Sequence, residues 1–157
     1  MKRVGTILGA LLIAAIIIVS GSAVANWAQS VYSHPNCTDW DEARFAPDGD
    51  LASVGEDGAP PILGVLTLDL GAGNEWGASQ DFVVYGDVPE GINETYLIKV
   101  ITKDWKTESS MWPGWDSEDL TFTTPSTPGL VWRYIRIIGT SGANDIWGPE
   151  IDAVGYY

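Results

Sequence analysis

The chain has 157 residues, enough for one domain with a buried core. It carries 21 acidic and 8 basic residues, a formal net charge of −13, which excludes nucleic-acid binding through phosphate neutralisation and disfavours anionic lipid surfaces. Its single cysteine, Cys37, excludes a disulfide within the chain, so packing or a bound metal ion must supply the stability.

The N-terminal segment has the layout of a secretory signal peptide. Lys2 and Arg3 precede an apolar run, and small residues in an A-x-A arrangement follow it. We expect residues 1–25 to be a signal peptide that is cleaved after Ala25. Two alternatives stay open: an uncleaved membrane anchor, and a pilin-type leader cut before Thr6, whose apolar segment would become a filament-core helix. All three place the rest of the chain outside the cytoplasm, secreted or at the cell surface, with membrane contact only through this segment.

Residues 26–157 have the pattern of one all-β domain. Short runs rich in β-branched and aromatic residues alternate with clusters of Gly, Pro, Asp and Asn. Strands are predicted, in chain order, over Trp27–Tyr32, Gly64–Leu70, Asp81–Tyr85, Thr95–Thr102, Asp119–Thr123, Trp132–Ile138 and Glu150–Tyr156. So many short strands predict a two-sheet β-sandwich of the jelly-roll type, preceded by the N-terminal apolar signal or anchor helix.

The segment from His34 to Ile62 interrupts this pattern. It is acidic and rich in Gly and Pro. A connection of this length inside a compact domain is usually functional or bound to an ion.

The predicted strand that begins at Trp132 contains two arginines among apolar residues. Tyr134 and Arg136 lie on one side of it, while Arg133 shares the other side with two isoleucines. One of the two arginines therefore lies near apolar neighbours and needs a partner.

Eight tryptophans are many for a chain of this size. The run Trp112-Pro-Gly-Trp115 is predicted to form a tight turn from which two indoles project, within a loop that begins near Trp105. Exposed indoles stack on the apolar faces of sugar rings and act as binding anchors, so these three are the candidate ligand-binding residues. The alternative is that they seal the ends of the core.

Several short segments follow one another in an order that resembles a known family. The segments are Ala43–Asp50, Leu51–Gly55, Gly64–Gly71, Ala78–Tyr85, Ile98–Asp104, Arg133–Ile137 and Ile151–Val154. On these residues the chain resembles the galactose-binding-like domains, the β-sandwich family that includes discoidin and coagulation factor V/VIII C-type modules, and most closely a microbial cell-surface branch. The ending, which is similar to the family's R-Y-[VI]-R-I and [IF]-D-A-V motifs, is the most specific part. In one departure, Trp105 stands where the family usually has Gly.

The resemblance implies a structural Ca²⁺ site that joins an early Asp-Gly loop to the start of the last strand. The matching positions are Asp48, Asp50 and Glu150, with Asp152 as a neighbour. Ca²⁺ takes about six to eight oxygen ligands, which an acidic Gly-rich turn can supply. The alternative is a plain turn in which Asp48 caps its own backbone and Glu150 faces solvent.

Catalytic motifs are scarce in the sequence. His34 is the only histidine, which excludes a His-rich zinc site and a serine triad with a separate histidine. Paired carboxylates for glycoside hydrolysis stay open as an alternative because acidic residues are abundant. We expect no enzymatic activity.

The sequence therefore predicts an exported cell-surface binding module that recognises carbohydrate or another surface ligand, with Ca²⁺ as an expected structural ion. The alternative is a structural subunit of an extracellular filament or surface layer, which would self-assemble.

Overall fold

The computed structural model describes residues 26–56, 62–77, 79–86, 94–115, 119–140 and 148–157. In this part of the chain all regular secondary structure is β-strand. Within it, no helix long and apolar enough to cross a membrane is present. The predicted signal or anchor helix over residues 1–25 lies outside the described residues.

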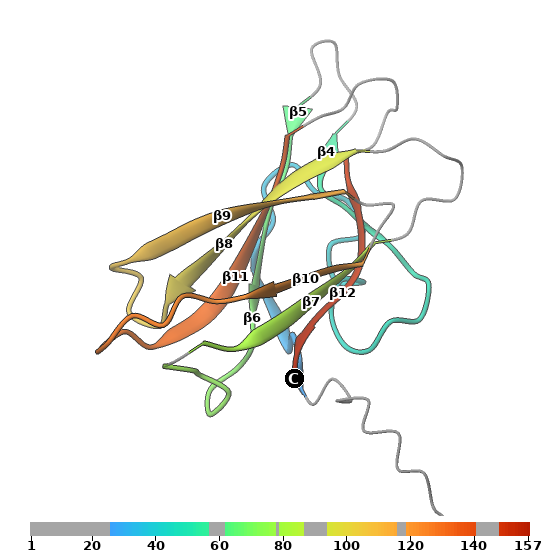
Figure 1. The fold of residues 1–157 in the computed structure, drawn as a ribbon. Helices are drawn as coiled ribbons and strands as arrows, with labels where there is room; N and C mark the ends of the chain where they lie inside the picture. Colours follow the sequence, from blue (N-terminus) through green and yellow to red (C-terminus); the bar gives the residue numbers. More distant parts are fainter. Residues whose placement is uncertain (1–25, 57–61, 78, 87–93, 116–118, 141–147) are drawn as a thin grey trace, which may run out of the picture.

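The first of two five-stranded antiparallel sheets contains both ends of the described chain (Figure 1). Its order is β1 (Asn26–Trp27), β12 (Glu150–Tyr156), β7 (Asp81–Gly86) and β10 (Leu120–Thr123), and β3 (Ala52–Ser53) also pairs with β12. The first and last described strands are therefore hydrogen-bonded neighbours.

The second sheet forms the other layer of the sandwich in Figure 1. Its order is β2 (Ser30–Ser33), β6 (Val65–Asp69), β11 (Trp132–Gly139), β8 (Thr95–Thr102) and β9 (Glu108–Trp115). All four pairings in this sheet are antiparallel. A separate two-stranded pair joins β4 (Gly55–Glu56) to β5 (Ile62–Leu63). The described part is thus an all-β sandwich of two antiparallel sheets, as the sequence predicts.

The core lies between the two sheets and draws on nearly every strand. The largest fully buried side chains are Trp132, Tyr96, Phe82, Leu66, Leu68, Leu70, Ile98, Ile101, Ile135, Ile137, Ile151 and Val54. Burial of one Leu or Ile side chain contributes about 1.5–3 kcal/mol. A core of this size accounts for a stable fold without a disulfide.

The predicted strands are present, with one division. The expected strand Trp27–Tyr32 is split into β1 and β2, which belong to different sheets. Between them the N–H of Ala28 donates to Val154 in the first sheet, and that of Gln29 donates to Asp69 in the second. The chain therefore crosses from one layer to the other at these two residues.

Strand β9 corrects the predicted turn at Trp112-Pro-Gly-Trp115. These residues are the last half of a strand whose register runs from Ile101 opposite Glu108 to Thr95 opposite Trp115. Proline lacks the N–H that an interior strand must donate, but an edge strand has one side without a partner strand. Because β9 is the edge of its sheet, Pro113 is compatible with pairing.

A bulge in β11 corrects the predicted side of Arg133. The register to β8 shifts between Trp132 and Tyr134, which breaks the strict alternation of a strand. Arg133 turns away from the isoleucines and lies against Asp69 at the end of β6. The prediction that one arginine of this strand needs a partner is confirmed.

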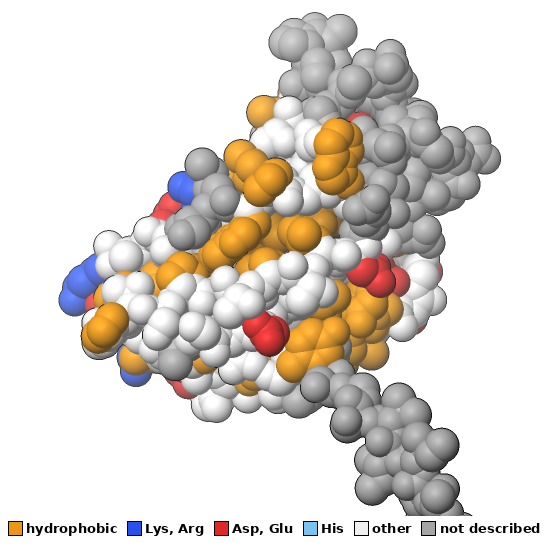
Figure 2. Space-filling model, in the orientation of Figure 1, with side chains coloured by type: hydrophobic (Ala, Val, Ile, Leu, Met, Phe, Trp, Pro, Cys, Tyr) orange, Lys and Arg blue, Asp and Glu red, His pale blue; other side chains and the backbone are white. Residues whose placement is uncertain are grey.

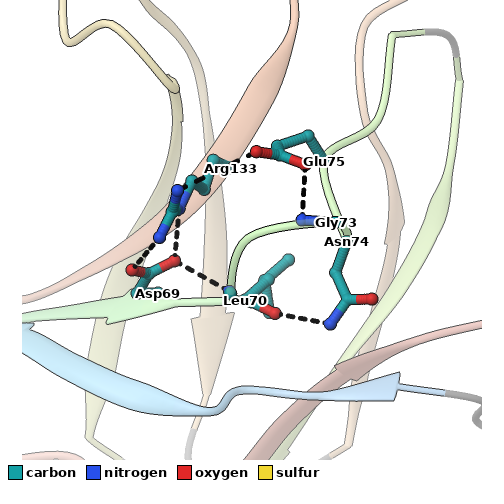
Figure 3. Close-up of polar contacts among 7 residues, drawn as sticks. Asp69, Leu70, Gly73, Asn74, Glu75 and Arg133 are labelled. Atoms are coloured by element: carbon teal, nitrogen blue, oxygen red, sulfur yellow. Dashed lines mark hydrogen bonds and ion pairs between the residues drawn. The ribbon is translucent and has the colours of Figure 1, made fainter.

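Figure 3 shows how Arg133 links two segments of the chain. Its Nε and Nη2 donate to the two carboxylate oxygens of Asp69 at 2.7 and 2.8 Å. Its Nη1 lies 3.8 Å from Glu75 Oε1, and Glu75 accepts the N–H of Gly73 at 2.8 Å. A bidentate arginine–carboxylate pair fixes geometry in two directions, so this pair holds the turn that follows β6.

Candidate functional site

An open hollow lies beside the end of β2. Its volume is about 610 Å³, and it is lined by Val31, Tyr32, Ser33, His34, Pro35, Asn36, Cys37 and Trp40. A space of this order accommodates a small ligand. All of these residues belong to one short stretch, so the local fold of that stretch creates the hollow.

This stretch doubles back because two of its residues adopt the left-handed backbone conformation. Asn36 has a φ of 56° and Asp39 a φ of 47°. Asn and Asp tolerate this conformation better than other residues that carry a side chain. The N–H of Cys37 donates to the carbonyl of His34 at 3.2 Å, which closes the first turn after β2.

Aromatic rings provide the apolar part of the hollow. The rings of His34 and Trp40 stack with centroids 4.0 Å apart and planes inclined by 11°. Tyr32 is 56% exposed although it is a large aromatic residue. Exposed ring faces of this kind can pack against the C–H face of a sugar ring.

Polar atoms at the same hollow come from Ser33, His34 and Asn36. The Asn36 Nδ2 donates to the carbonyl of Leu63 at 3.3 Å, which ties the lining to β5. The hydroxyl of Ser33, the imidazole nitrogens of His34 and the amide of Asn36 are groups that exchange hydrogen bonds with hydroxyls. The hollow therefore combines an apolar surface with donors and acceptors.

The segment after the hollow is strongly acidic. Desolvation raises the pKa of Glu42, and so do the negative charges of four neighbouring carboxylates, which are Asp41, Asp50, Asp48 and Asp39. Arg44 lies among them and forms a 3.3 Å ion pair with Asp41. The surroundings of the hollow on the Trp40 side are therefore negatively charged.

Tyr32 also belongs to an aromatic cluster on the outer face of the second sheet. We define the outer-face cluster as Tyr32, Trp105 and Tyr134. The ring centroids lie 4.4 Å apart for Tyr32 and Trp105, 5.3 Å for Tyr32 and Tyr134, and 4.8 Å for Trp105 and Tyr134. Ile101, opposite Tyr134 in the register, is fully buried. The cluster is thus a small apolar layer outside the main core.

The turn between β8 and β9 positions Trp105. Its N–H donates to the carbonyl of Thr102 at 2.9 Å, and its φ is 60°. A left-handed residue with a side chain costs roughly 1–2 kcal/mol relative to glycine. The contacts of the indole ring offset this cost. The Nε1 of Trp105 is buried without a hydrogen-bond partner among the described residues.

Charged side chains border the outer-face cluster. The Arg136 guanidinium lies 5.5 Å from the Trp105 ring centroid, a cation–π distance. Arg136 and Lys99 both pair with Glu108. The Lys99 hydrogen bond and the Arg136 charge lower the pKa of Glu108 despite its partial desolvation. At this border two cationic side chains therefore share one carboxylate.

The three predicted ligand-binding tryptophans do not share one site. Trp105 is in the outer-face cluster, next to the hollow. Trp112 packs against Phe122 with centroids 4.9 Å apart, and Trp115 is 50% exposed at the far end of β9. Trp115 pairs with Thr95 at one end of the β8–β9 pairing, and Trp105 lies in the turn beyond the other end, at Ile101. At about 3.3 Å per residue, the two ends of the pairing are roughly 20 Å apart.

Trp112 packs against the core, as expected from the alternative interpretation in which these tryptophans seal it. Figure 2 shows a band of hydrophobic side chains between β9 and β10, where the edges of the two sheets approach each other. Trp112 and Phe122 meet across this boundary. Trp112 therefore seals one side of the sandwich.

Sequence reasoning did not single out Tyr32, Asn36 and Trp40 as site residues, and it noted His34 only as the single histidine. The available signal was weak but present. The segment from His34 onward was expected to be functional, and it begins two residues after the exposed Tyr32.

The predicted calcium ligands are only partly brought together. The two carboxylate oxygens of Asp152 accept the N–H groups of Asp48 and Gly49 at 3.1 and 3.3 Å. Asp48 Oδ1 accepts the N–H of Asp50 at 3.1 Å, as in the capped turn of the alternative interpretation. Glu150 begins β12 and pairs with Ser53.

The fit of this region to Ca²⁺ is poor. No three His, Cys, Asp or Glu side chains within the described ranges are grouped so that they could hold a metal ion. The carboxylate of Asp152 is already occupied by backbone donors. Calcium binding stays a prediction from the sequence.

No protein-family model and no curated protein sequence matches the chain. Among solved structures, it is similar to the CBM32 of AlyQ in complex with 4,5-unsaturated mannuronic acid, at 14% identity and a TM-score of 0.49 over 83% of this chain and 97% of that one. It is also similar to an exo-β-1,3-galactanase from Phanerochaete chrysosporium with β-1,3-galactotriose, at 13% identity and a TM-score of 0.39. That match covers 84% of this chain and 27% of the galactanase chain. At these identities each match concerns the fold alone.

Proposed function

We propose that residues 26–157 form a non-catalytic glycan-binding module with a jelly-roll, galactose-binding-like sandwich, exported to the cell surface. The observation that carries the proposal is the hollow at Tyr32, His34 and Trp40, where polar groups share one concave surface with the exposed ring of Tyr32 and the half-buried ring of Trp40. The N-terminal pattern supports export.

The chemistry of the hollow suits a sugar. A pyranose ring has an apolar C–H face and a rim of hydroxyls, and the hollow presents the complementary groups. Aromatic packing contributes about 0.5–1.5 kcal/mol beyond area burial, and each hydrogen bond about 0.5–1.5 kcal/mol. One stacked ring with about three hydrogen bonds contributes roughly 2–6 kcal/mol, which corresponds to a Kd between tens of millimolar and tens of micromolar.

The composition of the lining favours binding over hydrolysis. Glycoside hydrolases need a pair of carboxyl groups about 5–10 Å apart that flank the bond to be cleaved. Within the described residues that line the hollow, no Asp or Glu occurs. A hydrolytic role would require acids that reach in from elsewhere.

A glycan array tests the proposal. The purified protein is probed with and without EDTA, and hits are confirmed by isothermal titration calorimetry. We expect saturable binding to at least one sugar class, with EDTA having no effect, because the hollow is built from side chains and backbone. Absence of binding to every class would contradict the proposed function, and release of product would contradict its non-catalytic character.

A further inference from the structure

Phe45 combines an exposed apolar ring with a strained backbone. Its side chain is 58% exposed, and its φ of 68° lies in the left-handed region. A bulky side chain is an outlier in this conformation, which costs roughly 1–2 kcal/mol, and an exposed ring gains little from packing. Strained residues of this kind cluster at functional positions. The ring of Phe45 is therefore a candidate contact for a partner.

The backbone of Phe45 lies beside the start of the described chain. Its N–H donates to the carbonyl of Ala28 at 3.2 Å, and Ala28 directly follows β1. The guanidinium of Arg44 lies 5.0 Å from the centroid of the Phe45 ring. An exposed aromatic ring and a cation thus stand next to the point where residues 1–25 join the domain.

Two aromatic rings occupy the outer face of the first sheet at β1. The ring centroids of Trp27 and Tyr85 lie 5.7 Å apart. The next residue after Trp27, Ala28, and the residue before Tyr85, Val84, both belong to the core. Because side chains alternate along a strand, the two rings point away from the core. Both residues are partly exposed.

The C-terminal residue extends this group. Tyr157 neighbours Tyr85 and is also partly exposed. Desolvation raises the pKa of Tyr85, and Tyr157 and Asp119 raise it further, so the phenol is uncharged at neutral pH. Figure 2 shows hydrophobic side chains on the surface near the C-terminus that is marked in Figure 1. We define the aromatic patch as Trp27, Phe45, Tyr85 and Tyr157.

The sequence that leads into the patch is long enough to cross a membrane. No charged residue occurs from Val4 to Val24, and a bilayer core requires about 20 such residues. Lys2 and Arg3 stand before this run and Trp27 stands after it. Basic residues on the cytoplasmic side and Trp or Tyr at the membrane–water interface are the usual flanks of a membrane span.

We propose that residues 1–25 are retained as a membrane anchor and that the aromatic patch rests on the interfacial region of a zwitterionic bilayer. The occupant follows from the place of the patch at the end of the apolar run and from its aromatic composition. The net charge of −13 argues against an anionic surface. This inference goes beyond the proposed glycan-binding function and does not depend on it.

Retention of the anchor is tested by the mass of the exported protein. The full chain is expressed in a bacterial host, and the membrane and soluble fractions are compared by mass spectrometry. We expect the mass of the full chain in the membrane fraction. A shorter form, whether it begins at Thr6 or at Asn26, would overturn the inference.

Contact with lipid is tested by fluorescence quenching in the full chain, reconstituted in phosphatidylcholine vesicles with brominated acyl chains. Phe45→Trp and Tyr85→Trp each add an indole to the patch. Leu63→Trp is the matched control, because Leu63 is 48% exposed on β5, at the opposite end of the domain from the C-terminus in Figure 1. The signal of interest is the fluorescence that each variant adds to that of the parent.

We expect the added fluorescence to be quenched at positions 45 and 85 and not at position 63. Bromines near the headgroup should quench more than deep ones, because interfacial groups lie about 5–10 Å into the boundary. Equal quenching at all three positions, or none in the patch, would overturn the inference. Vesicles with added phosphatidylglycerol should quench less, because the lipid and the domain have like charge. Stronger quenching there would overturn the choice of a zwitterionic surface.

Phe45→Gly separates a membrane role from a structural one. Glycine suits the φ of 68°, so the melting temperature should stay the same or rise. In the Tyr85→Trp background, Phe45→Gly should reduce the quenching at position 85. Unchanged quenching would overturn the role of Phe45. Absence of glycan binding in the array would leave all of these results in place, so the two proposals fail separately.

Discussion

The carboxylate of Asp152 accepts the N–H of Asp48 at 3.1 Å, although 104 residues separate the two in the chain. Its second oxygen accepts the N–H of Gly49 at 3.3 Å. The last strand therefore holds the acidic segment that follows the hollow. This contact does for the loop what the predicted metal site would do, and it needs only backbone donors.

Asp152→Ala should lower the free energy of unfolding by about 1–3 kcal/mol, because it leaves backbone N–H groups without acceptors. Asp50→Ala is the control, since Asp50 takes part in this turn through its backbone N–H. Urea unfolding with EDTA and with Ca²⁺ measures both. A loss that appears only in the presence of Ca²⁺ would support a metal site instead.

From the ion pair between Asp69 and Arg133 we predict that the stability of the fold falls in acid. Burial raises its pKa, but the Arg133 hydrogen bonds and the N–H of Gly71 outweigh this and lower the pKa below its ordinary value of 3.8. A depressed folded-state pKa adds stability above that ordinary value, and the stability is lost as pH falls through the lower folded value. We expect the melting temperature to fall in this acid range.

Asp69→Asn isolates that contribution. The variant should lose about 1.5–3 kcal/mol at neutral pH, the range for hydrogen bonds to charged groups. It should also show a shallower decline of stability below pH ~4 than the parent, because it lacks this titrating group. If the stability of the two proteins declined equally below pH ~4, the ion pair between Asp69 and Arg133 would not be coupled to folding.

From the left-handed backbone at Trp105 we predict that a glycine at this position is more stable than an alanine. At most positions Ala is more stable than Gly, but the φ of 60° at Trp105 favours Gly. Both Trp105→Gly and Trp105→Ala should be less stable than the parent because the ring contacts with Tyr32 and Tyr134 are lost. The Gly variant should exceed the Ala variant by about 1 kcal/mol. The usual order in thermal unfolding would contradict the left-handed assignment.

Trp112 and Trp115 should respond differently to truncation. Trp112→Ala removes the contact with Phe122 at the boundary of the two sheets and should cost roughly 2–4 kcal/mol, somewhat below the range for fully buried aromatic residues. Trp115→Ala removes a half-exposed side chain and should change stability by less than about 0.5 kcal/mol. Equal losses in denaturant unfolding would contradict the two assigned environments.

Local pattern was sufficient for most strands and insufficient for two features. Alternation of Leu66, Leu68 and Leu70 with polar residues indicates β6 directly. The β9 strand was missed because Pro113 and Gly114 are typical turn residues, and only their place at a sheet edge makes them compatible with pairing. The bulge at Trp132 depends on register between strands, which no local pattern contains.

The candidate site was also predicted only in part from the sequence. Motif order placed the Asp48 loop near Asp152, and the structure brings them together, but the bonding groups differ from the predicted ones. The hollow was not foreseen because it depends on the left-handed conformations of Asn36 and Asp39. These fold the chain back so that Trp40 meets His34.

The most direct test of the account is the loss of glycan binding on truncation of the rings that line the hollow. Tyr32→Ala and Trp40→Ala, with Trp115→Ala as an exposed aromatic control, are titrated with the best glycan from the array. We expect each of the first two changes to weaken binding at least about 10-fold, equivalent to 1.4 kcal/mol, with the control at parental affinity. Parental affinity in both hollow variants, or loss of binding only in the Trp115 variant, would contradict the account.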